Sequence, residues 1–334
     1  MHSFIKRALC VISMLAVCAA LTAAADFTPF LPAPTPYPAP PEELDPRERV
    51  PVPVIMYHSI LRNPRRRNMY TITPRELEAD MVWLQSEGYE TVTPQQVIDY
   101  VHKGAALPEK PVMLTFDDGY YNNIFYGTPL LEKYSMRAVM FAVGAYCDRA
   151  VREDDRNPNY SYITWDDMKD MSLGGVWDIQ SHTYDMHSEA PRLGVRRRSG
   201  ESDGKYRAAL REDITRITES IAETTDKVPN AFAYPFGAIT PEAEEILREK
   251  GYRATFSSYE GTSVIRKGDE ASLFQIKRCL RRSGRPASGI VGRQAACNPC
   301  SRGLFSAFSF GSPGMCRERT NRAGLSQTPP AYRR

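Results

Sequence analysis

Short apolar runs alternate with capped amphipathic helices along most of the chain, and this alternation restricts the folds open to it. The runs have the length and composition of buried parallel strands. Helices begin at sequences such as Thr73-Pro74-Arg75-Glu76, where a threonine cap precedes a proline and then a glutamate. Such spacing predicts βαβ units and a parallel sheet with right-handed crossovers. The expected strands are residues 52–57, 112–116, 137–143, 176–180, 231–234, 253–256 and 273–277.

The number of units and the length of 334 residues favour a barrel of about seven or eight strands. A doubly wound open sheet is the alternative. No glycine-rich phosphate loop follows any expected strand, which weakens the nucleotide-binding versions of that alternative. A content of 42% hydrophobic and 25% charged residues is that of an ordinary globular protein. The net charge of +3 is too small to indicate a nucleic-acid partner.

The N-terminal segment has the pattern of an export signal. Lys6 and Arg7 precede an apolar core at residues 8–21, and three alanines then form a small-residue cleavage site before Asp26. We therefore expect a signal peptide over residues 1–25, with an uncleaved membrane anchor as the alternative. The proline-rich residues 26–53 are expected to be a semi-extended linker.

Residues 279–334 differ in character from the rest of the chain. They hold ten arginines, no lysine and one acidic residue, Glu318, and they show no clear helical or strand period. We interpret them as an atypical Arg-rich tail, either disordered or read in a shifted frame, with a basic binding tail as the alternative. Cys297 and Cys300 form a lone CxxC with no second pair or nearby histidine, so they are not assigned to a zinc site.

The chain has only five histidines, and three of them follow expected strands. His2 lies in the signal segment, and His102 is predicted to be a solvated cation at a helix end. His58, His182 and His187 each come after a strand-like run. Any one of them alone would more often be a structural or surface histidine.

Two adjacent carboxylates, Asp117 and Asp118, end the apolar run that begins at Val112. An Asp-Asp-Gly sequence can be an ordinary solvated turn. In α/β folds, however, ligands bind and catalytic groups lie at the carboxyl ends of parallel strands. Two imidazoles and one carboxylate with open positions for water make a hydrolytic metal site, and a second carboxylate is free to take a proton.

Three segments together resemble the ordered motifs of the polysaccharide deacetylases, carbohydrate esterase family 4. They are Thr115-Phe116-Asp117-Asp118-Gly119, Ser181-His182-Thr183-Tyr184-Asp185-Met186-His187 and Tyr234-Pro235-Phe236-Gly237. The resemblance covers roughly residues 52–278, and we assign residues 54–278 to the catalytic domain. It implies an α/β fold, a distorted (β/α) barrel of about seven parallel strands. It also implies metal-dependent removal of N-acetyl groups from sugar polymers.

The same resemblance assigns roles to individual residues. Asp117 is expected to be the general base, and Asp118, His182 and His187 the metal ligands. The backbone N–H of Phe236 is expected to help hold the oxyanion. The metal is expected to be Zn²⁺, although Co²⁺, Ni²⁺ and Fe²⁺ accept the same ligands.

The chain departs from the usual family pattern in three ways. Its two motif histidines are five residues apart rather than four, a spacing similar to that of the biofilm poly-N-acetylglucosamine deacetylases. Ala233 stands where an arginine often lies, so another group must tune Asp117. The late Leu-x-His motif that supplies the acid is absent. His58 is expected to fill that role, as in a similar early Tyr-His segment of the biofilm enzymes; the alternative is a satisfied histidine at a strand end.

These expectations combine into an exported metal-dependent deacetylase that acts on N-acetylglucosamine-containing glycans. Peptidoglycan or an exopolysaccharide is the expected polymer partner, with chitin oligomers as a second option. The protein is expected to be extracellular or associated with the cell envelope, and to contact a membrane only if the N-terminal segment is uncleaved. A catalytically inactive glycan-binding module on the same barrel is the alternative from a different class. The oligomeric state is not indicated.

Overall fold

A computed structural model describes residues 48–66 and 68–295. The expected signal peptide, most of the proline-rich linker and residues 296–334 with the CxxC pair lie outside the described residues. Within the described part of the chain, no helix has the length and apolar character needed to cross a bilayer.

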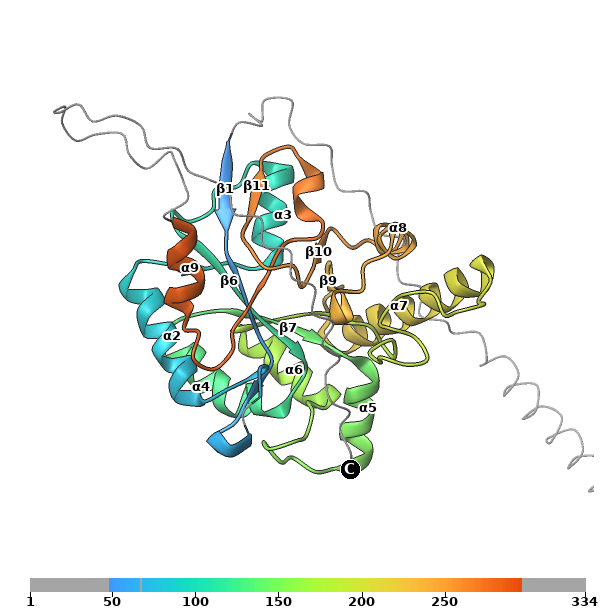
Figure 1. The fold of residues 1–334 in the computed structure, drawn as a ribbon, viewed down its shortest axis with the longest axis horizontal. Coiled ribbons are helices and arrows are strands. Elements are labelled where there is room, and N and C mark those ends of the chain that lie inside the picture. Colours follow the sequence, from blue (N-terminus) through green and yellow to red (C-terminus); the bar gives the residue numbers. More distant parts are fainter. Residues whose placement is uncertain (1–47, 67, 296–334) are drawn as a thin grey trace, which may run out of the picture. The chain divides into compact units, whose positions relative to one another are not determined.

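A curled sheet of seven parallel strands forms the centre of the fold (Figure 1). Its strands run in the order β10-β9-β8-β7-β6-β2-β12, and the short β5 pairs with the start of β6. This arrangement confirms the expected α/β class and the distorted (β/α) barrel. The strand bounds are β2 Val54–Tyr57, β5 Glu90–Thr91, β6 Pro111–Asp118, β7 Ala138–Ala142, β8 Trp177–Ser181, β9 Ala231–Ala233, β10 Ala254–Phe256 and β12 Cys279–Leu280.

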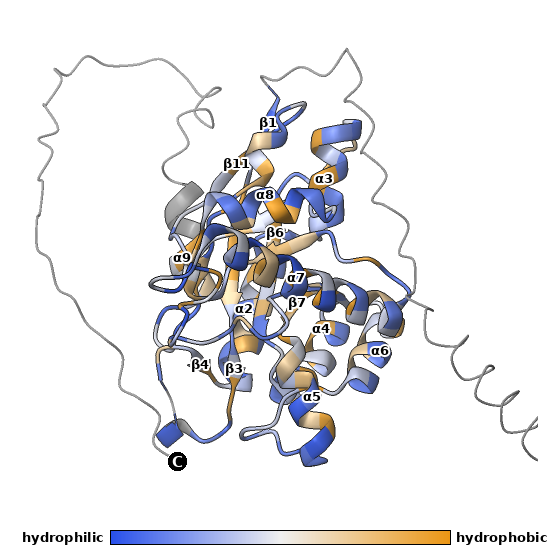
Figure 2. Cartoon of the chain, turned by 90° about the vertical axis from the view of Figure 1, so that its right-hand side faces the viewer, coloured by the Kyte–Doolittle hydropathy of each residue, from blue (hydrophilic) through white to orange (hydrophobic). Residues whose placement is uncertain are grey.

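Helices connect the strands, and their apolar faces lie against the sheet, where the hydrophobic residues gather (Figure 2). Capping boxes begin three of these helices at Thr73, Thr93 and Thr164. The α-helices are α2 Pro74–Ser86, α3 Pro94–Lys103, α4 Thr128–Lys133, α5 Gly144–Glu153, α6 Trp165–Gly174, α7 Asp203–Thr225, α8 Pro241–Glu249 and α9 Ala287–Ala295. Shorter turns are η1 Pro64–Arg66, η2 Asn123–Gly127 of π type, η3 Pro235–Gly237 and η4 Glu270–Leu273.

Two short ribbons lie beside the main sheet. β1 Arg49–Val52 pairs antiparallel with β11 Ser263–Arg266, so the last residues of the expected linker are part of a strand. β3 Ser59–Ile60 pairs parallel with β4 Thr71–Ile72.

Two expectations from the sequence are wrong. Residues 273–277 do not form a strand, because Gln275 has φ of +58° and interrupts the extended run, leaving Ile276 with a single bridge to Phe256. His102 is not solvated: it is only 5% exposed, and burial lowers its pKa.

The first residues of the Arg-rich segment lie inside the fold. β12 extends the sheet next to β2, and α9 packs against α2. Between them, the buried Arg281 guanidinium binds the buried Asp80 carboxylate, with Nε to Oδ2 at 2.6 Å. The boundary that we placed after Arg278 therefore falls within the sheet.

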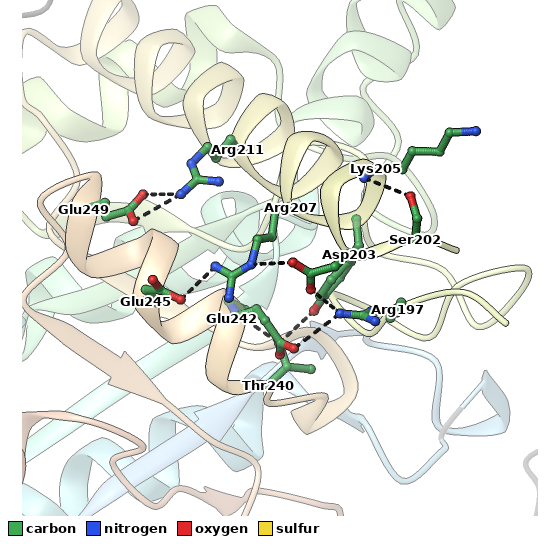
Figure 3. A network of polar contacts seen from close by, with 12 residues as sticks. Arg197, Ser202, Asp203, Lys205, Arg207, Arg211, Thr240, Glu242, Glu245 and Glu249 are labelled. Carbon is green, nitrogen blue, oxygen red and sulfur yellow. Dashed lines mark hydrogen bonds and ion pairs between the residues drawn. The ribbon is translucent and has the colours of Figure 1, made fainter. Parts of the chain in front are cut away.

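Helices α7 and α8 face each other through a ladder of ion pairs (Figure 3). Arg207 reaches Glu245 at 2.7 Å, and Arg211 reaches Glu249 at 2.8 Å. These side chains are partly exposed, and such pairs typically contribute about 0–1 kcal/mol each. The buried apolar side chains beneath the ladder, including Leu210, Ile214 and Ile246, hold the two helices together.

Candidate metal centre and active site

The three motif segments meet at the carboxyl edge of the sheet because their strands are neighbours in register. Asp118 at the end of β6 is opposite Ala142 of β7, which is opposite Ser181 of β8. Ser181 in turn is opposite Phe232 of β9. The acidic motif, the histidine motif and the turn after β9 therefore leave the sheet side by side.

Each motif has one non-glycine residue in the left-handed region of backbone space. The φ angles are +74° at Asp118, +79° at Thr183 and +56° at Phe236. Such conformations cost on the order of 1–3 kcal/mol each and persist only where surrounding contacts enforce them. Each motif therefore carries backbone strain near the place where the chain turns out of the sheet into the site.

Asp118, His182 and His187 form a compact group of three ligand atoms that all lie within 4.8 Å of one another. The Asp118 Oδ1 atom is 3.1 Å from His187 Nε2 and 3.7 Å from His182 Nε2. Two imidazole nitrogens and one carboxylate oxygen are a donor set that suits Zn²⁺ and related divalent cations. The three residues therefore fit the metal that the family motifs imply.

The ring of His182 is held by a backbone carbonyl. Its Nδ1 lies 2.7 Å from the oxygen of Ala233, an acceptor only, so Nδ1 carries the hydrogen and Nε2 keeps its lone pair. Burial lowers the pKa of His182 to about 4, so the imidazole is neutral at physiological pH. A neutral ring with its lone pair toward Asp118 is the form that can bind a cation.

Charges around Asp118 keep it ionised. Burial raises its pKa, but the hydrogen bond and charge of His187, followed by the charges of His58 and His182, outweigh burial and hold the pKa well below its usual value. The pKa of His187 is raised, because the bond to Asp118 outweighs the effect of burial.

Asp117, the residue before Asp118 in β6, binds an arginine that was not predicted from the sequence to be in the site. The Arg278 Nη1 atom is 2.7 Å from Asp117 Oδ1, and the two side chains are 1% and 3% exposed. Arg278 also donates from Nε to the carbonyl of Ser257 at 3.0 Å. Burial raises the pKa of Asp117, but the charges of Arg278, His182 and His58 lower it to below the usual value.

Arg278 is therefore the group that tunes Asp117 in place of the arginine missing at Ala233. We had expected a substitute but gave no position for it, because the two residues are 161 positions apart. No periodic or motif signal in the sequence points to Arg278, which stands at the end of the expected catalytic domain.

His58 lies beside Asp117, on the side away from Arg278's contact. Its Nε2 is 3.9 Å from Asp117 Oδ2, and its ring centroid is 4.9 Å from that of Tyr70. The side chain is 14% exposed, so the ring borders the site rather than the core. The structure thus brings His58 to the site; its role as the acid stays a prediction.

Phe236 lies next to the metal-ligand group. Its ring centroid is 4.7 Å from that of His187, and the residue is 44% exposed. Its positive φ lies outside the right-handed helical region, although Phe236 is part of the short helical turn η3. The role of its N–H at an oxyanion stays a prediction.

A buried carboxylate holds the loop that joins the two ligand histidines. Asp213 of α7 accepts hydrogen bonds from the backbone N–H groups of Tyr184 at 2.8 Å and Asp185 at 2.7 Å. This role of Asp213 was not predicted, although the sequence holds a signal for it: Asp213 interrupts the apolar stripe of the helix at residues 206–224, between Leu210 and Ile214. An acid within a buried stripe needs a partner, and here the partner is backbone.

The fold and the motifs agree with known proteins. Residues 104–255 match the family model described as polysaccharide deacetylase. The poly-β-1,6-N-acetyl-D-glucosamine N-deacetylase of Escherichia coli K12 is 27% identical over 229 residues, which are 62% of this chain and 34% of that protein. The chain thus spans about a third of the length of this relative.

Two solved structures share the fold. A de-N-acetylase from Aggregatibacter actinomycetemcomitans is 26% identical with a TM-score of 0.62, covering 73% of this chain and 99% of that one. IcaB from Ammonifex degensii is 28% identical with a TM-score of 0.59, covering 72% and 96%. The family match, the three ordered motifs and the shared fold agree: residues 104–255 match the polysaccharide deacetylase family, and the described fold is similar to those of solved deacetylases.

Proposed function

We propose that the protein is an exported, metal-dependent deacetylase that hydrolyses the N-acetyl groups of N-acetylglucosamine-containing glycans. The observation that carries this proposal is that the two adjacent carboxylates, Asp117 and Asp118, have different partners. Asp118 lies with two histidines in a cation-binding group, while Asp117 stays ionised outside that group, bound to Arg278. A binding module would not need a second buried and ionised carboxylate next to a metal site.

Asp118, His182 and His187 would hold the cation, which we propose to be Zn²⁺, with Co²⁺, Ni²⁺ or Fe²⁺ as substitutes. When bound, it supplies a Lewis acid that polarises the acetamide carbonyl and lowers the pKa of water. The neutral form of His182 and the ionised form of Asp118 are the protonation states that this binding requires.

Asp117 is suited to accept a proton from the attacking water because its carboxylate is ionised and held in place. Arg278 fixes one oxygen, and the other oxygen lies toward His58. His58 is proposed to give a proton to the departing amine when the carbon–nitrogen bond breaks. The backbone N–H of Phe236 is proposed to donate to the developing oxyanion. The products are acetate and a free amine on the glycan.

The choice of polymer rests on the relatives. The E. coli relative carries the name poly-β-1,6-N-acetyl-D-glucosamine N-deacetylase, so this polymer is the first substrate to test, followed by peptidoglycan and chitin oligomers. Export is proposed from the basic and apolar pattern of residues 1–25.

The test measures acetate release from N-acetylglucosamine polymers by the purified protein, with and without a chelator. Release that stops with chelator and returns with Zn²⁺ would support the proposal. Binding to the glycan that persists without metal, together with no acetate release from a folded and metal-loaded protein, would instead favour the inactive glycan-binding module.

A further inference from the structure

The rings of the two ligand histidines are held by partners of different chemistry. The partner of His182 is the carbonyl of Ala233, which can only accept a hydrogen bond. The partner of His187 is the hydroxyl of Tyr146, whose oxygen lies 3.0 Å from Nδ1 of that ring. A hydroxyl can donate or accept, so it can serve either tautomer of the imidazole.

For both rings to bind a cation through Nε2, only His187 has to change the position of its ring hydrogen. His182 already carries its hydrogen on Nδ1, so its Nε2 is free. Nε2 of His187, in contrast, lies 3.1 Å from Asp118 Oδ1, the geometry of an N–H donating to a carboxylate. For Nε2 of His187 to bind a cation, the hydrogen must leave Nε2, and Nδ1 must then carry one.

The Tyr146 hydroxyl also has a second hydrogen-bond acceptor. Because of it, no polar group loses its partner when the hydrogen moves from Nε2 to Nδ1 of His187. Its hydroxyl oxygen lies 3.3 Å from the backbone carbonyl of His187 itself. With Nδ1 of His187 unprotonated, the hydroxyl donates to Nδ1. With Nδ1 protonated, the hydroxyl turns to donate to the carbonyl and accepts from Nδ1.

We propose that Tyr146 is a positioning residue whose hydroxyl reorients between Nδ1 and the carbonyl of His187, and so stabilises the metal-binding tautomer of that histidine. This inference rests on the proposed function only in that Asp118, His182 and His187 bind a cation. It adds a residue outside the three motifs to the metal site.

The Tyr146 ring is fixed by groups that do not belong to the histidine loop. Its centroid is 4.4 Å from that of Tyr162, and the Arg149 guanidinium lies over both rings, at 5.2 Å and 4.7 Å. Its backbone N–H donates to the carbonyl of Val143 at 3.1 Å, in the first turn of α5. The phenol is therefore a fixed reference against which the His187 ring is oriented.

The experiment compares Zn²⁺ affinity in the wild-type protein, Tyr146→Phe and Tyr162→Phe, by competition with a chromogenic chelator. Tyr146→Phe keeps the stacked ring and removes only the hydroxyl. Tyr162→Phe is the matched control, because its hydroxyl hydrogen-bonds with Tyr120 and Arg149 and interacts with the ligand Asp118 only through charge. We expect Tyr146→Phe to bind Zn²⁺ about tenfold or more weakly, as for other partners of metal-bound histidines, and the control to bind like wild type. The melting temperatures of the metal-free proteins should agree.

A second measurement on the wild type does not depend on any variant. Nitrogen-15 spectra of labelled histidine should show the hydrogen of one ligand ring moving from Nε2 to Nδ1 when Zn²⁺ is added, while the other ring keeps Nδ1–H throughout. Equal Zn²⁺ affinity of Tyr146→Phe and wild type, or two ligand rings that both keep their tautomer, would overturn the role of Tyr146 and leave the proposed function standing. A wild-type protein that binds no divalent cation would overturn both.

Discussion

Arg278 and Asp117 form a buried ion pair between residues that are 161 positions apart, with Nη1 and Oδ1 separated by 2.7 Å. The pair joins the residue that precedes β12 to the carboxyl end of β6. It keeps the proposed base ionised in a place where burial alone would favour the neutral acid.

Replacing this arginine should change the pH dependence of the reaction. In Arg278→Gln, the pKa of Asp117 rises because its largest favourable charge is lost. Asp117 must be ionised to act as a base, so the acid limb of the kcat/KM profile should move to higher pH, by about 1–3 pH units. An unchanged acid limb would argue against Asp117 as the base or Arg278 as its tuning group.

The same variant should be less stable, by about 3–5 kcal/mol in the free energy of unfolding, since the buried Asp117 carboxylate loses its ion-pair partner. Arg285→Gln is the control. The Arg285 guanidinium pairs with Glu260 at 2.7 Å, but both side chains are partly exposed, so we expect a loss of about 0–1 kcal/mol.

The adjacent carboxylates should be separable by experiment. Asp117→Asn should lower kcat by about 10²–10⁴-fold, the typical contribution of a positioned base, while Zn²⁺ affinity stays near that of wild type. Asp118→Asn should instead lose Zn²⁺ affinity, because an amide is a poorer ligand than a carboxylate. Calorimetric titration with Zn²⁺ beside acetate release distinguishes the two; a loss of metal binding in Asp117→Asn would contradict the assignment.

Asp213 should contribute to stability in a pH-dependent way. Burial raises its pKa to about 6 in the folded protein, despite the backbone N–H groups that lower it, against about 3.9 for an unperturbed carboxyl. The folded state therefore holds the proton more tightly than the unfolded state between those values. The stability from this group is fully present below about pH 4 and is lost as pH rises through about 6.

Asp213→Asn should remove that pH dependence, so the difference in unfolding free energy between wild type and variant should shrink from pH 4 to pH 7. The variant also replaces one acceptor of the Tyr184–Asp185 backbone by an NH₂ group, which should cost about 1–3 kcal/mol. Glu212→Gln, at an exposed neighbouring position of α7, is the control and should leave the difference constant. Urea unfolding at several pH values is the measurement.

The segment after Arg278 should be needed for folding. A chain ending at residue 278 lacks β12, the Arg281 partner of Asp80 and the buried Ile290 of α9. A chain ending at residue 295 retains all three. We expect the longer chain to unfold cooperatively and the shorter one to be several kcal/mol less stable or unfolded, as judged by circular dichroism and urea titration. Equal stability of the two would show that the fold ends at Arg278 after all.

The sequence by itself determined the parallel α/β sheet and the position of the motif residues. Both depend on local patterns. Apolar runs of strand length, separated by helices with threonine caps, leave few arrangements other than parallel strands with crossovers. Once the strands are parallel, the polar residues that follow them, such as Asp118 and His182, must gather at one edge.

The same local patterns led to wrong predictions where the structure of a segment depends on a single backbone angle or on a contact with a distant residue. The apolar run at residues 273–277 has a strand-like composition, but the positive φ of Gln275 breaks it. The arginines after Cys279 suggested a tail that is disordered or read in a shifted frame. Arg281 is nevertheless buried, because it forms an ion pair with Asp80 of α2. Composition cannot show that a charged side chain has a buried partner.

Only the tertiary structure decided how the site is held in its working state. Arg278 reaches Asp117 across the sheet, Asp213 reaches the histidine loop from α7, and Tyr146 reaches His187 from α5. Each of these contacts joins segments that are distant in the chain, and none follows from the periodicity of either segment. Sequence patterns specify which face of an element is buried, but hydrogen-bond partners between elements depend on angles and separations that only the packed structure sets.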